Sequence, residues 1–346
     1  MKKYLKAKLS RSNKEPERPS RITNETVAEH REQILAGGRK FKYPVQYSRH
    51  KLVINTIIIS IVTLVVLVLV GWWQLYSVQN TSKFMYRVTQ LLPIPVATVD
   101  GVGVRFSDYL KKYRSSIHFL EQQNAINVRT DDGKRQVEFY KRRELDNAIK
   151  DAYIAKVARQ NKVSVSNKEV DDFIKTELDA KNVSVDAYER TVLNNFYDWS
   201  LDEYEGIVKS ELLKRRVSFA IDTVARDKAN RIKQAVAGGA DFAELAKVES
   251  DDPSTKANGG AIGTVPVNNQ DSNGVIAAAL KLQPGQVSGL IEGADGYYLI
   301  KLTAKDASTV QYSLIKILLT ELDKRFEAVK KNDKIQEYIS VAKQQS

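Results

Sequence analysis

The hydrophobic pattern of the chain is dominated by one uninterrupted apolar run, residues 52–73, which carries no charged side chain. At about 1.5 Å per residue, these 22 residues suffice to cross a hydrocarbon layer that is roughly 30 Å thick. A buried core helix is the alternative interpretation, but uncharged runs of this length are typical of membrane spans. We therefore predict a single transmembrane helix over residues 52–73.

The segment after this run, residues 74–92, is interpreted as a linker. A short hairpin centred on the tight-turn dipeptide Asp100-Gly101 follows, and a helical pattern then begins at Phe106. The pattern stays helical almost throughout to about residue 222 and predicts four or five helices. Capping-box sequences mark two helix starts, at Ser166-x-x-Glu169 and Ser200-x-x-Glu203. Aromatic residues on these helices are interpreted as core, with a polypeptide-binding groove as the alternative.

The last third of the chain mixes helical and strand patterns. Two helices are expected first, the second of them capped by Asp241. Residues 296–302 predict a strand from their aromatic and β-branched content. Helices on one face of a small antiparallel sheet give an α+β domain. Residues 306–346 are expected to contribute a strand and an amphipathic helix that pack back on the preceding domains.

The charge of the chain is unevenly distributed. Of its 54 basic and 42 acidic residues, 14 and 5 lie within residues 1–51, a net charge of +9, and the other 40 and 37 leave only +3. The basic tail is expected to be largely disordered beside an anionic inner leaflet. The positive-inside bias predicts a cytoplasmic N-terminus, with residues after 76 outside. The tail lacks interleaved aromatic and basic residues, so we predict no nucleic-acid partner.

Composition limits the chemistry. The chain has no Cys, which excludes thiol catalysis, disulfides and cysteine–zinc sites. Its three histidines, His30, His50 and His118, disfavour a multi-histidine metal site or a serine–histidine triad. We therefore expect no metal and no cofactor.

Two parts of the sequence resemble known families. Residues 155–178, preceded by 96–110, resemble the helical chaperone module of SurA-like and PrsA-like envelope foldases. Residues 225–265 and 276–302 resemble the parvulin-type peptidyl-prolyl isomerase domain. The motifs that carry this second resemblance are Gly259-Gly260-x-x-Gly263, Leu282-x-Pro284-Gly285-x-Val287-Ser288 and the closing Gly296-Tyr-Tyr-x-Ile-x-Leu. Several separated motifs in the right order make it specific.

The parvulin resemblance implies a set of site residues. Asp252 falls on the position of the family's central Cys or Asp, while Asp295 and Tyr298 fall on polar and histidine positions of the closing strand. These three are the predicted catalytic residues. An equally weighted interpretation makes Asp252 a turn-former before Pro253. The predicted substrate-binding positions are Gln270, with Asp271 as its alternative, Val275, Leu280 and Leu314.

The sequence departs from the family pattern at its first strand, which normally carries a histidine. Two segments are candidates for that strand, residues 217–222 before the domain and residues 310–317 after it. The second is richer in β-formers and places Leu314 at the histidine position. Because no histidine follows residue 118, we expect isomerase activity to be weak.

These observations predict a membrane-tethered, extracytoplasmic folding factor that isomerises prolyl bonds without a cofactor. Its predicted partners are unfolded or proline-containing secreted polypeptides and membrane lipid. The alternatives are a non-catalytic holdase that uses the parvulin fold as a scaffold, and an envelope sensor or adhesin. The predicted domains are the tail (1–51), the transmembrane helix (52–73), the linker (74–92), the helical chaperone module (93–222), the parvulin-like domain (223–305) and the C-terminal strand and helix (306–346).

Overall fold

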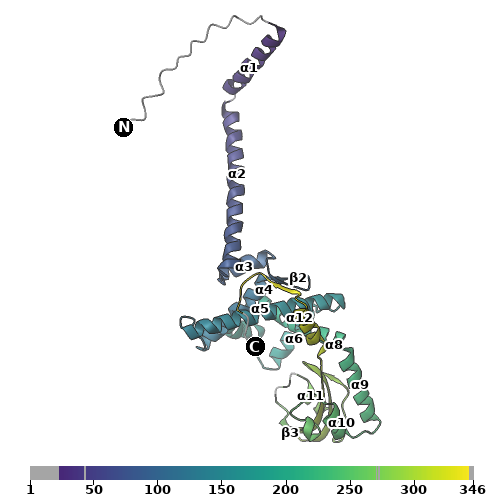
Figure 1. Ribbon diagram of the computed structural model, residues 1–346. Coiled ribbons are helices and arrows are strands. Elements are labelled where there is room, and N and C mark those ends of the chain that lie inside the picture. The colour runs from purple at the N-terminus through teal and green to yellow at the C-terminus, as the bar shows by residue number, and fades with distance from the viewer. Residues whose placement is uncertain (1–22, 43, 270, 272, 343–346) are drawn as a thin grey trace. The chain divides into compact units, whose positions relative to one another are not determined.

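The structure is a computed structural model that describes residues 23–42, 44–269, 271 and 273–342. The chain divides after Gln74 into two compact units (Figure 1). Within the second unit we call residues 75–221 together with 320–342 the helical module, and residues 222–319 the sheet domain.

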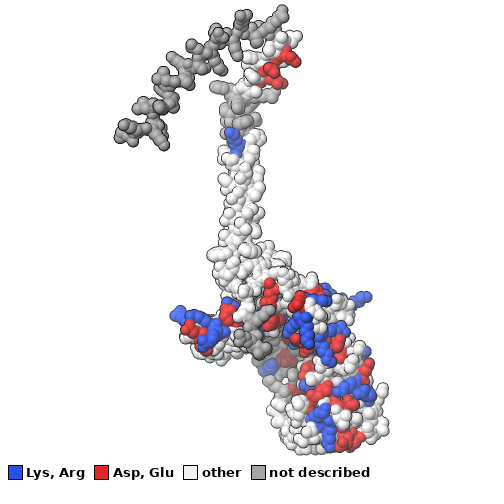
Figure 2. Space-filling view, viewed as in Figure 1, with Lys and Arg blue, Asp and Glu red and all other residues white. Residues whose placement is uncertain are grey.

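The first unit contains two helices, α1 (Asn24–Lys42) and α2 (Pro44–Trp72). The predicted disorder of the tail is wrong for α1, because Thr23 and Thr26 exchange hydrogen bonds at its start and Glu25 favours the helix N-terminus. The predictions for residues 1–22 lie outside the described residues. Helix α2 includes nearly all of the apolar run, and residues 50–77 form a helical stretch long and apolar enough to cross a membrane. Its surface in Figure 2 is uncharged over most of its length.

The second unit begins at Leu75, within the last turn of this helical stretch. Trp73–Ser77 form a π-helical turn (η1), in which Leu75 is only 2% exposed and Tyr76 donates a hydrogen bond to the Pro95 carbonyl at 2.7 Å. Residues 83–91, expected within a linker, instead form helix α3 (Lys83–Leu91). Ser82 caps that helix, and its residues Tyr86 and Thr89 are buried. The expectation of a linker over the whole of 74–92 is therefore wrong.

The helical module contains a small antiparallel sheet in the order β2-β1-β7. Its strands are β1 (Pro95–Val99), β2 (Val102–Arg105) and β7 (Ile335–Glu337). Asp100 and Gly101 take positive φ angles of 46° and 81°, which makes the turn between β1 and β2. The remaining elements are α4 (Phe106–Gln122), α5 (Asp131–Gln160), α6 (Asn167–Asp179), α7 (Val185–Tyr188), the π-helix η2 (Glu189–Tyr197), α8 (Leu201–Ile221) and α12 (Glu321–Lys331). Both predicted capping boxes are present, at the starts of α6 and α8.

The core of the helical module joins segments from both ends of the chain. Phe106, Leu110 and Leu145 from α4 and α5 are fully buried in it. Helix α12 contributes Phe326, whose ring lies 5.5 Å from that of Tyr153. The module is therefore complete only when the C-terminal segment has packed against it.

The sheet domain is built on a four-stranded antiparallel sheet in the order β3-β6-β5-β4. Its strands are β3 (Ala261–Pro266), β4 (Ile291–Glu292), β5 (Gly296–Lys305) and β6 (Thr309–Leu318). Helices α9 (Thr223–Ala237) and α10 (Phe242–Glu249) cover one face, a 3-10 turn (η3, Lys256–Asn258) follows them, and α11 (Val275–Leu280) covers the other face. Alternation along β5 sends Tyr297 and Leu299 to the first face and Tyr298 and Ile300 to the second. The predicted α+β class is confirmed.

The central strand β6 comes from the C-terminal side of the domain. Residues 310–317 lie in β6 and pair with both β3 and β5, whereas residues 217–221 end helix α8. Val217 is fully buried in the core of the helical module, and Asp222 caps helix α9, so the chain passes from helix to helix without a strand. Of the two predicted candidates, the second therefore supplies the strand.

Candidate functional site

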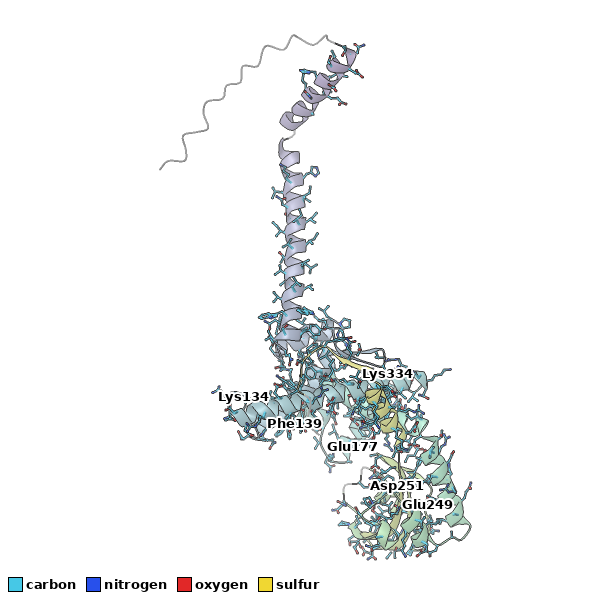
Figure 3. The ribbon with its side chains drawn as sticks, in the orientation of Figure 1. Lys134, Phe139, Glu177, Glu249, Asp251 and Lys334 are labelled. Atoms are coloured by element: carbon cyan, nitrogen blue, oxygen red, sulfur yellow. The ribbon has the colours of Figure 1, made fainter. Side chains whose placement is uncertain are left out.

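The loop that carries Asp252 is fixed to the backbone of β6. Ser250 is completely buried, and its hydroxyl accepts a hydrogen bond from the Lys316 amide at 3.1 Å. The Asp251 amide donates to the Lys316 carbonyl at 2.7 Å, and its carboxylate accepts from the Leu318 amide at 3.0 Å. Asp251 and Glu249, labelled in Figure 3, also lie within 3.0 and 3.9 Å of the Lys228 ammonium. The position of residue 252 is thereby set by the central strand.

Asp252 itself is half-buried and folds over its own turn. Its carboxylate accepts hydrogen bonds from the Ser254 amide at 3.3 Å and from the Thr255 hydroxyl at 2.5 Å. This is the geometry of an Asx turn, so the turn-forming role is present in the structure. Each carboxylate oxygen can accept a further hydrogen bond, because it has more than one lone pair.

Tyr298 lies on the α11 face of β5 and is almost fully buried. Its hydroxyl donates to Asp295 at 2.5 Å, and Asp295 also forms an ion pair of 2.8 Å with Lys316. The Lys316 ammonium lies 5.6 Å from the centre of the Tyr298 ring. Since Lys316 is opposite Tyr298 in the β5–β6 register, one residue of the central strand positions both the Asp252 loop and the Tyr298–Asp295 pair.

The electrostatics of the site keep Tyr298 protonated. The pKa of Tyr298 is raised far above its ordinary value, and burial is the largest cause. The hydrogen bond to Asp295 and the negative charges of Asp295, Asp252 and Asp271 raise it further. Burial acts to raise the pKa of Asp295 too, but the hydrogen bonds from Lys316 and Tyr298 outweigh it and hold that pKa below its ordinary value. At neutral pH the site therefore combines a neutral phenol with a carboxylate–ammonium pair.

The short helix α11 and the loop before it border the same site. Asp271 accepts hydrogen bonds from the Ile276 amide at 2.6 Å and the Asn273 amide at 2.9 Å, which holds the start of the helix. Asn273 in turn accepts from the Ala294 amide at 2.9 Å. Gly293 is required beside it, because a Cβ atom there would overlap the Tyr298 ring.

The structure brings together some of the predicted residues and separates others. Tyr298 is hydrogen-bonded to Asp295, and the charge of Asp252 contributes to the raised pKa of Tyr298. Val275 and Leu314 are buried in the hydrophobic cluster that contains Tyr298, on the α11 side of the sheet. Leu280 is exposed at the other end of α11, and its carbonyl accepts from Lys305 near the far end of β5. Gln270 lies outside the described residues.

Lys316 is the site residue that the sequence reasoning missed. The signal was present in the alternation of residues 310–317, which puts Tyr312, Leu314 and Lys316 on one face of the strand. A lysine two positions beyond a buried leucine is ordinarily a solvated edge residue. Its role depends on its cross-strand neighbour Tyr298, and that neighbour is fixed only by the strand register.

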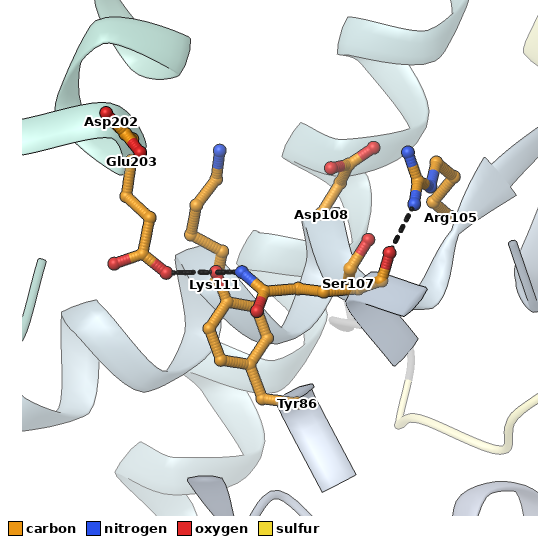
Figure 4. Close-up of a pocket in the computed structure, with 8 residues that line it drawn as sticks. Tyr86, Arg105, Ser107, Asp108, Lys111, Asp202 and Glu203 are labelled. Atoms are coloured by element: carbon orange, nitrogen blue, oxygen red, sulfur yellow. Dashed lines mark hydrogen bonds between the residues drawn. The ribbon is translucent and has the colours of Figure 1, made fainter. Parts of the chain in front are cut away.

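Apart from this site, a polar pocket lies in the helical module between α3, α4 and α8 (Figure 4). Its volume is about 300 Å³. The Tyr86 hydroxyl donates to Glu203, and Gln90 donates to the same hydroxyl at 2.8 Å. Lys111 also lines the pocket, and burial lowers the pKa of its ammonium. These contacts tie α3 to the start of α8. Over the described residues, no group of three or more His, Cys, Asp or Glu side chains is placed to hold a metal ion.

The chain matches two family models that meet at the end of α8. The model of the SurA-like N-terminal domain matches residues 46–218, half of the chain, and the chain belongs to this family. The model of the PPIC-type PPIASE domain matches residues 217–304. The second match thus ends before β6, the strand that occupies the centre of the sheet. The predicted resemblance to SurA-like and PrsA-like foldases with a parvulin-type domain is confirmed.

Named relatives agree with these matches. A foldase protein PrsA from Clostridium kluyveri is 29% identical over 171 residues, which cover 47% of this chain and 46% of that protein. One from Caldanaerobacter subterraneus subsp. tengcongensis is 28% identical over 276 residues, covering 70% of this chain and 87% of that protein. The chain therefore spans about half the length of the first relative. A crystal structure of foldase protein PrsA from Streptococcus pneumoniae covers 60% of this chain and 85% of its own at 22% identity, with a TM-score of 0.22.

Proposed function

We propose that this protein is a membrane-tethered, extracytoplasmic folding factor that catalyses the cis–trans isomerisation of X-Pro bonds in unfolded or proline-containing secreted polypeptides. The PPIC-type domain supports the reaction class. The observation that supports the proposal is that Lys316 contacts both parts of the candidate site: its amide donates to Ser250, two residues before Asp252, and its ammonium pairs with Asp295, the hydrogen-bond partner of Tyr298.

The chemistry required is modest. Rotation about the bond crosses a barrier of about 20 kcal/mol because the planar amide is conjugated. A catalyst accelerates it by binding the twisted amide, whose nitrogen has lost conjugation, more tightly than the planar one. In our proposal the proline ring rests on the face floored by Val275 and Leu314, and polar groups of Asp252 and Tyr298 face the twisting amide. Gln270 and Leu280 would contact the flanking residues of the substrate.

Activity should be weak, because no histidine follows residue 118 and Val275 offers less apolar surface than the Phe that the family resemblance implies there. An apolar surface that binds the proline ring less tightly by about 1–2 kcal/mol lowers the isomerisation rate roughly tenfold. The test uses the full-length chain in detergent and a series of proline peptides whose isomerisation is followed by NMR exchange. Catalysis above the uncatalysed rate is expected, and Asp252→Asn should lower it about tenfold, the effect of 1.4 kcal/mol. A wild-type rate equal to the uncatalysed one would favour the holdase alternative.

The chain offers a matched control for that variant. Asp252 begins the sequence Asp-Pro-Ser-Thr, and Asp306 begins Asp-Ala-Ser-Thr at the turn between β5 and β6. Asp306 likewise accepts from the backbone and hydroxyls of the two residues that close its turn. Asp306→Asn weakens the same kind of turn away from Tyr298 and should leave the rate unchanged. Equal losses in both variants would show that Asp252 acts only as a turn-former.

The proposed topology has the N-terminus in the cytoplasm and residues after 76 outside, because the basic residues concentrate before the apolar run. Basic residues of the tail are proposed to contact anionic lipid. Protease added to intact cells should digest the second unit and spare the tail. Protection of the second unit would refute the topology and, with it, the extracytoplasmic function.

The helical module is proposed to bind unfolded chains. Most aromatic residues of α4 and α5, including Tyr109 and Tyr153, are buried in the core. Phe139 on α5 and Phe173 on α6 remain exposed. The full-length chain in detergent should slow the aggregation of a denatured test protein, and Phe139→Ser with Phe173→Ser should weaken this effect. An unchanged effect in the double variant would exclude these two rings as client contacts.

A further inference from the structure

Helix α3 presents an unusual outer face. Its inner side carries Tyr86 and Thr89, which are buried, whereas Phe84 and Leu91 are 71% and 85% exposed. Leu92, directly after the helix, is half exposed. We define the outer face of α3 as Phe84, Arg87 and Leu91. It carries two large apolar side chains and one cation, and no acidic residue belongs to it.

The inner side of α3 is fixed to the helical module by polar contacts. The Tyr86 hydroxyl donates to Glu203 at the start of α8, as Figure 4 shows. Arg105 donates to the Gln90 carbonyl at 3.1 Å, and Lys83 pairs with Asp198 at 2.8 Å. Helix α3 is therefore part of the folded unit, and its exposed apolar residues cannot turn inward.

The position of α3 in the sequence determines what can cover this face. The apolar helical stretch ends at Ser77, and only residues 78–82 separate it from α3. Five extended residues reach at most roughly 18 Å. If the stretch spans a bilayer, α3 therefore lies within that distance of the lipid surface at every moment.

From this we propose that the outer face of α3 docks on the membrane surface, with Phe84 and Leu91 in the headgroup–acyl boundary and Arg87 beside anionic headgroups. Interfacial helices bury large apolar side chains such as Phe and Leu at the headgroup–acyl boundary, and nearby basic side chains add attraction to anionic lipid. Because α3 is fixed to the helical module, docking also sets the orientation of the whole second unit on the bilayer. The proposal rests on the membrane anchor proposed above.

The absence of cysteine allows a direct test. A single cysteine introduced as Leu92→Cys carries an environment-sensitive fluorophore in the full-length chain, reconstituted in nanodiscs with about one-third anionic lipid, near a biological range. The control reporter is Val248→Cys, which replaces a 70% exposed side chain of the sheet domain. We expect a blue-shifted emission and strong quenching by nitroxide-labelled lipid at residue 92, and neither at residue 248. A water-like signal at residue 92 overturns docking.

Variants then identify the contact. Phe84→Ser and Leu91→Ser in the Leu92→Cys background should each lower the docked-to-undocked ratio roughly tenfold, because each removes a large apolar side chain that docking buries in the lipid. The double variant Val224→Ser with Val248→Ser, at two exposed positions of the sheet domain, should change nothing. An equal loss in the control pair overturns the assignment to α3.

Two further outcomes are decisive. Flotation with vesicles reports the anchor separately: a chain that floats but shows a water-like signal at residue 92 refutes docking alone, whereas a chain that does not float refutes the anchor and docking together. A blue shift that appears in detergent and grows with protein concentration would mean that a second copy covers the outer face of α3, and that also refutes docking on lipid.

Discussion

The two sheets of the second unit both contain a strand from the last forty residues of the chain, but they place it differently. In the helical module, β7 is an edge strand that pairs with three residues of β1. In the sheet domain, β6 is a central strand that pairs with β5 over residues 310–318 and with β3 over residues 309–313. An edge strand adds to a sheet that already exists, whereas a central strand creates it. The same C-terminal segment is therefore supportive in one region and indispensable in the other.

The largest effect should come from two truncations. A chain that ends at Lys305 loses β6, which leaves β3 without a partner and β5 paired only with the two residues of β4 and, through a single bridge at Lys301, with Val287. A chain that ends at Thr320 keeps β6 but loses α12 and β7. Hydrogen exchange should show an unfolded sheet domain in the first chain and a folded one, beside a loosened helical module, in the second. Protected β5 amides in the chain ending at Lys305 would contradict the comparison.

A smaller loss is expected from Gly260→Ala. Gly260 has a φ of +80°, and a Cβ atom there would overlap the Leu314 carbonyl of β6. Alanine at this left-handed position is strained and must also displace the central strand. The substitution should therefore lower the free energy of unfolding by about 3 kcal/mol, the upper end of the range for a strained backbone position. Denaturant-dependent exchange of the β6 amides measures it. Gly289→Ala, where a Cβ atom meets open space at an ordinary φ, should cost little. Equal costs at both positions would mean that close approach to β6 is unimportant.

The edge strand should be less sensitive. Arg142 on α5 is buried and donates to both carboxylate oxygens of Glu337 on β7, at 2.8 and 2.9 Å. Glu337→Gln leaves part of the guanidinium unpaired and should destabilise the helical module by about 1–2 kcal/mol, while the sheet domain is unaffected. Exchange rates in β1 and β5 separate the two regions. Glu327→Gln, in an exposed pair with Lys330, serves as the control. A loss shared by both regions would show that they unfold together.

The smallest effect concerns acid. Hydrogen bonds from Arg216 and from the Ser166 backbone lower the pKa of Glu169 to about 2 from an ordinary 4.5. Its folded pKa is depressed, so its contribution to stability is present above pH 4.5 and is lost as the pH falls through 2. An NMR titration of the Glu169 side chain should give this pKa, and Arg216→Gln should raise it toward the ordinary value. Titration near 4.5 in the unmodified chain would contradict the link between α6 and α8.

Local signals in the sequence predicted local structure well. The capping boxes at Ser166 and Ser200 and the turn at Asp100 are present because each depends on residues no more than three apart. Helix α3 was missed because its buried face is short: Tyr86 and Met85 join the core, and polar contacts with distant residues supply the other attachments. A sequence pattern cannot show such contacts, since Glu203 lies far along the chain.

The candidate site was predicted in part for the same reason. Asp252, Asp295 and Tyr298 fall on positions that the family resemblance identifies; in the structure Tyr298 is hydrogen-bonded to Asp295, and Ser250, two residues before Asp252, is hydrogen-bonded to the Lys316 amide. Lys316 has no motif, and its importance follows from the register that sets it opposite Tyr298. The catalytic roles of Asp252, Asp295 and Tyr298 stay predictions until the isomerisation rates are measured.

The late position of β6 and β7 also affects how the protein is made. Synthesis proceeds from the N-terminus, and β1, near residue 97, cannot meet its partner near residue 337 until about 240 further residues have been produced. Contacts this distant in sequence form slowly compared with those inside helices. Throughout that interval the apolar halves of both sheets are uncovered, which makes the nascent chain an unfolded polypeptide of the kind that we propose the finished protein binds. Under the proposed function, newly made copies of this chain therefore belong to the class of polypeptides that a finished copy binds.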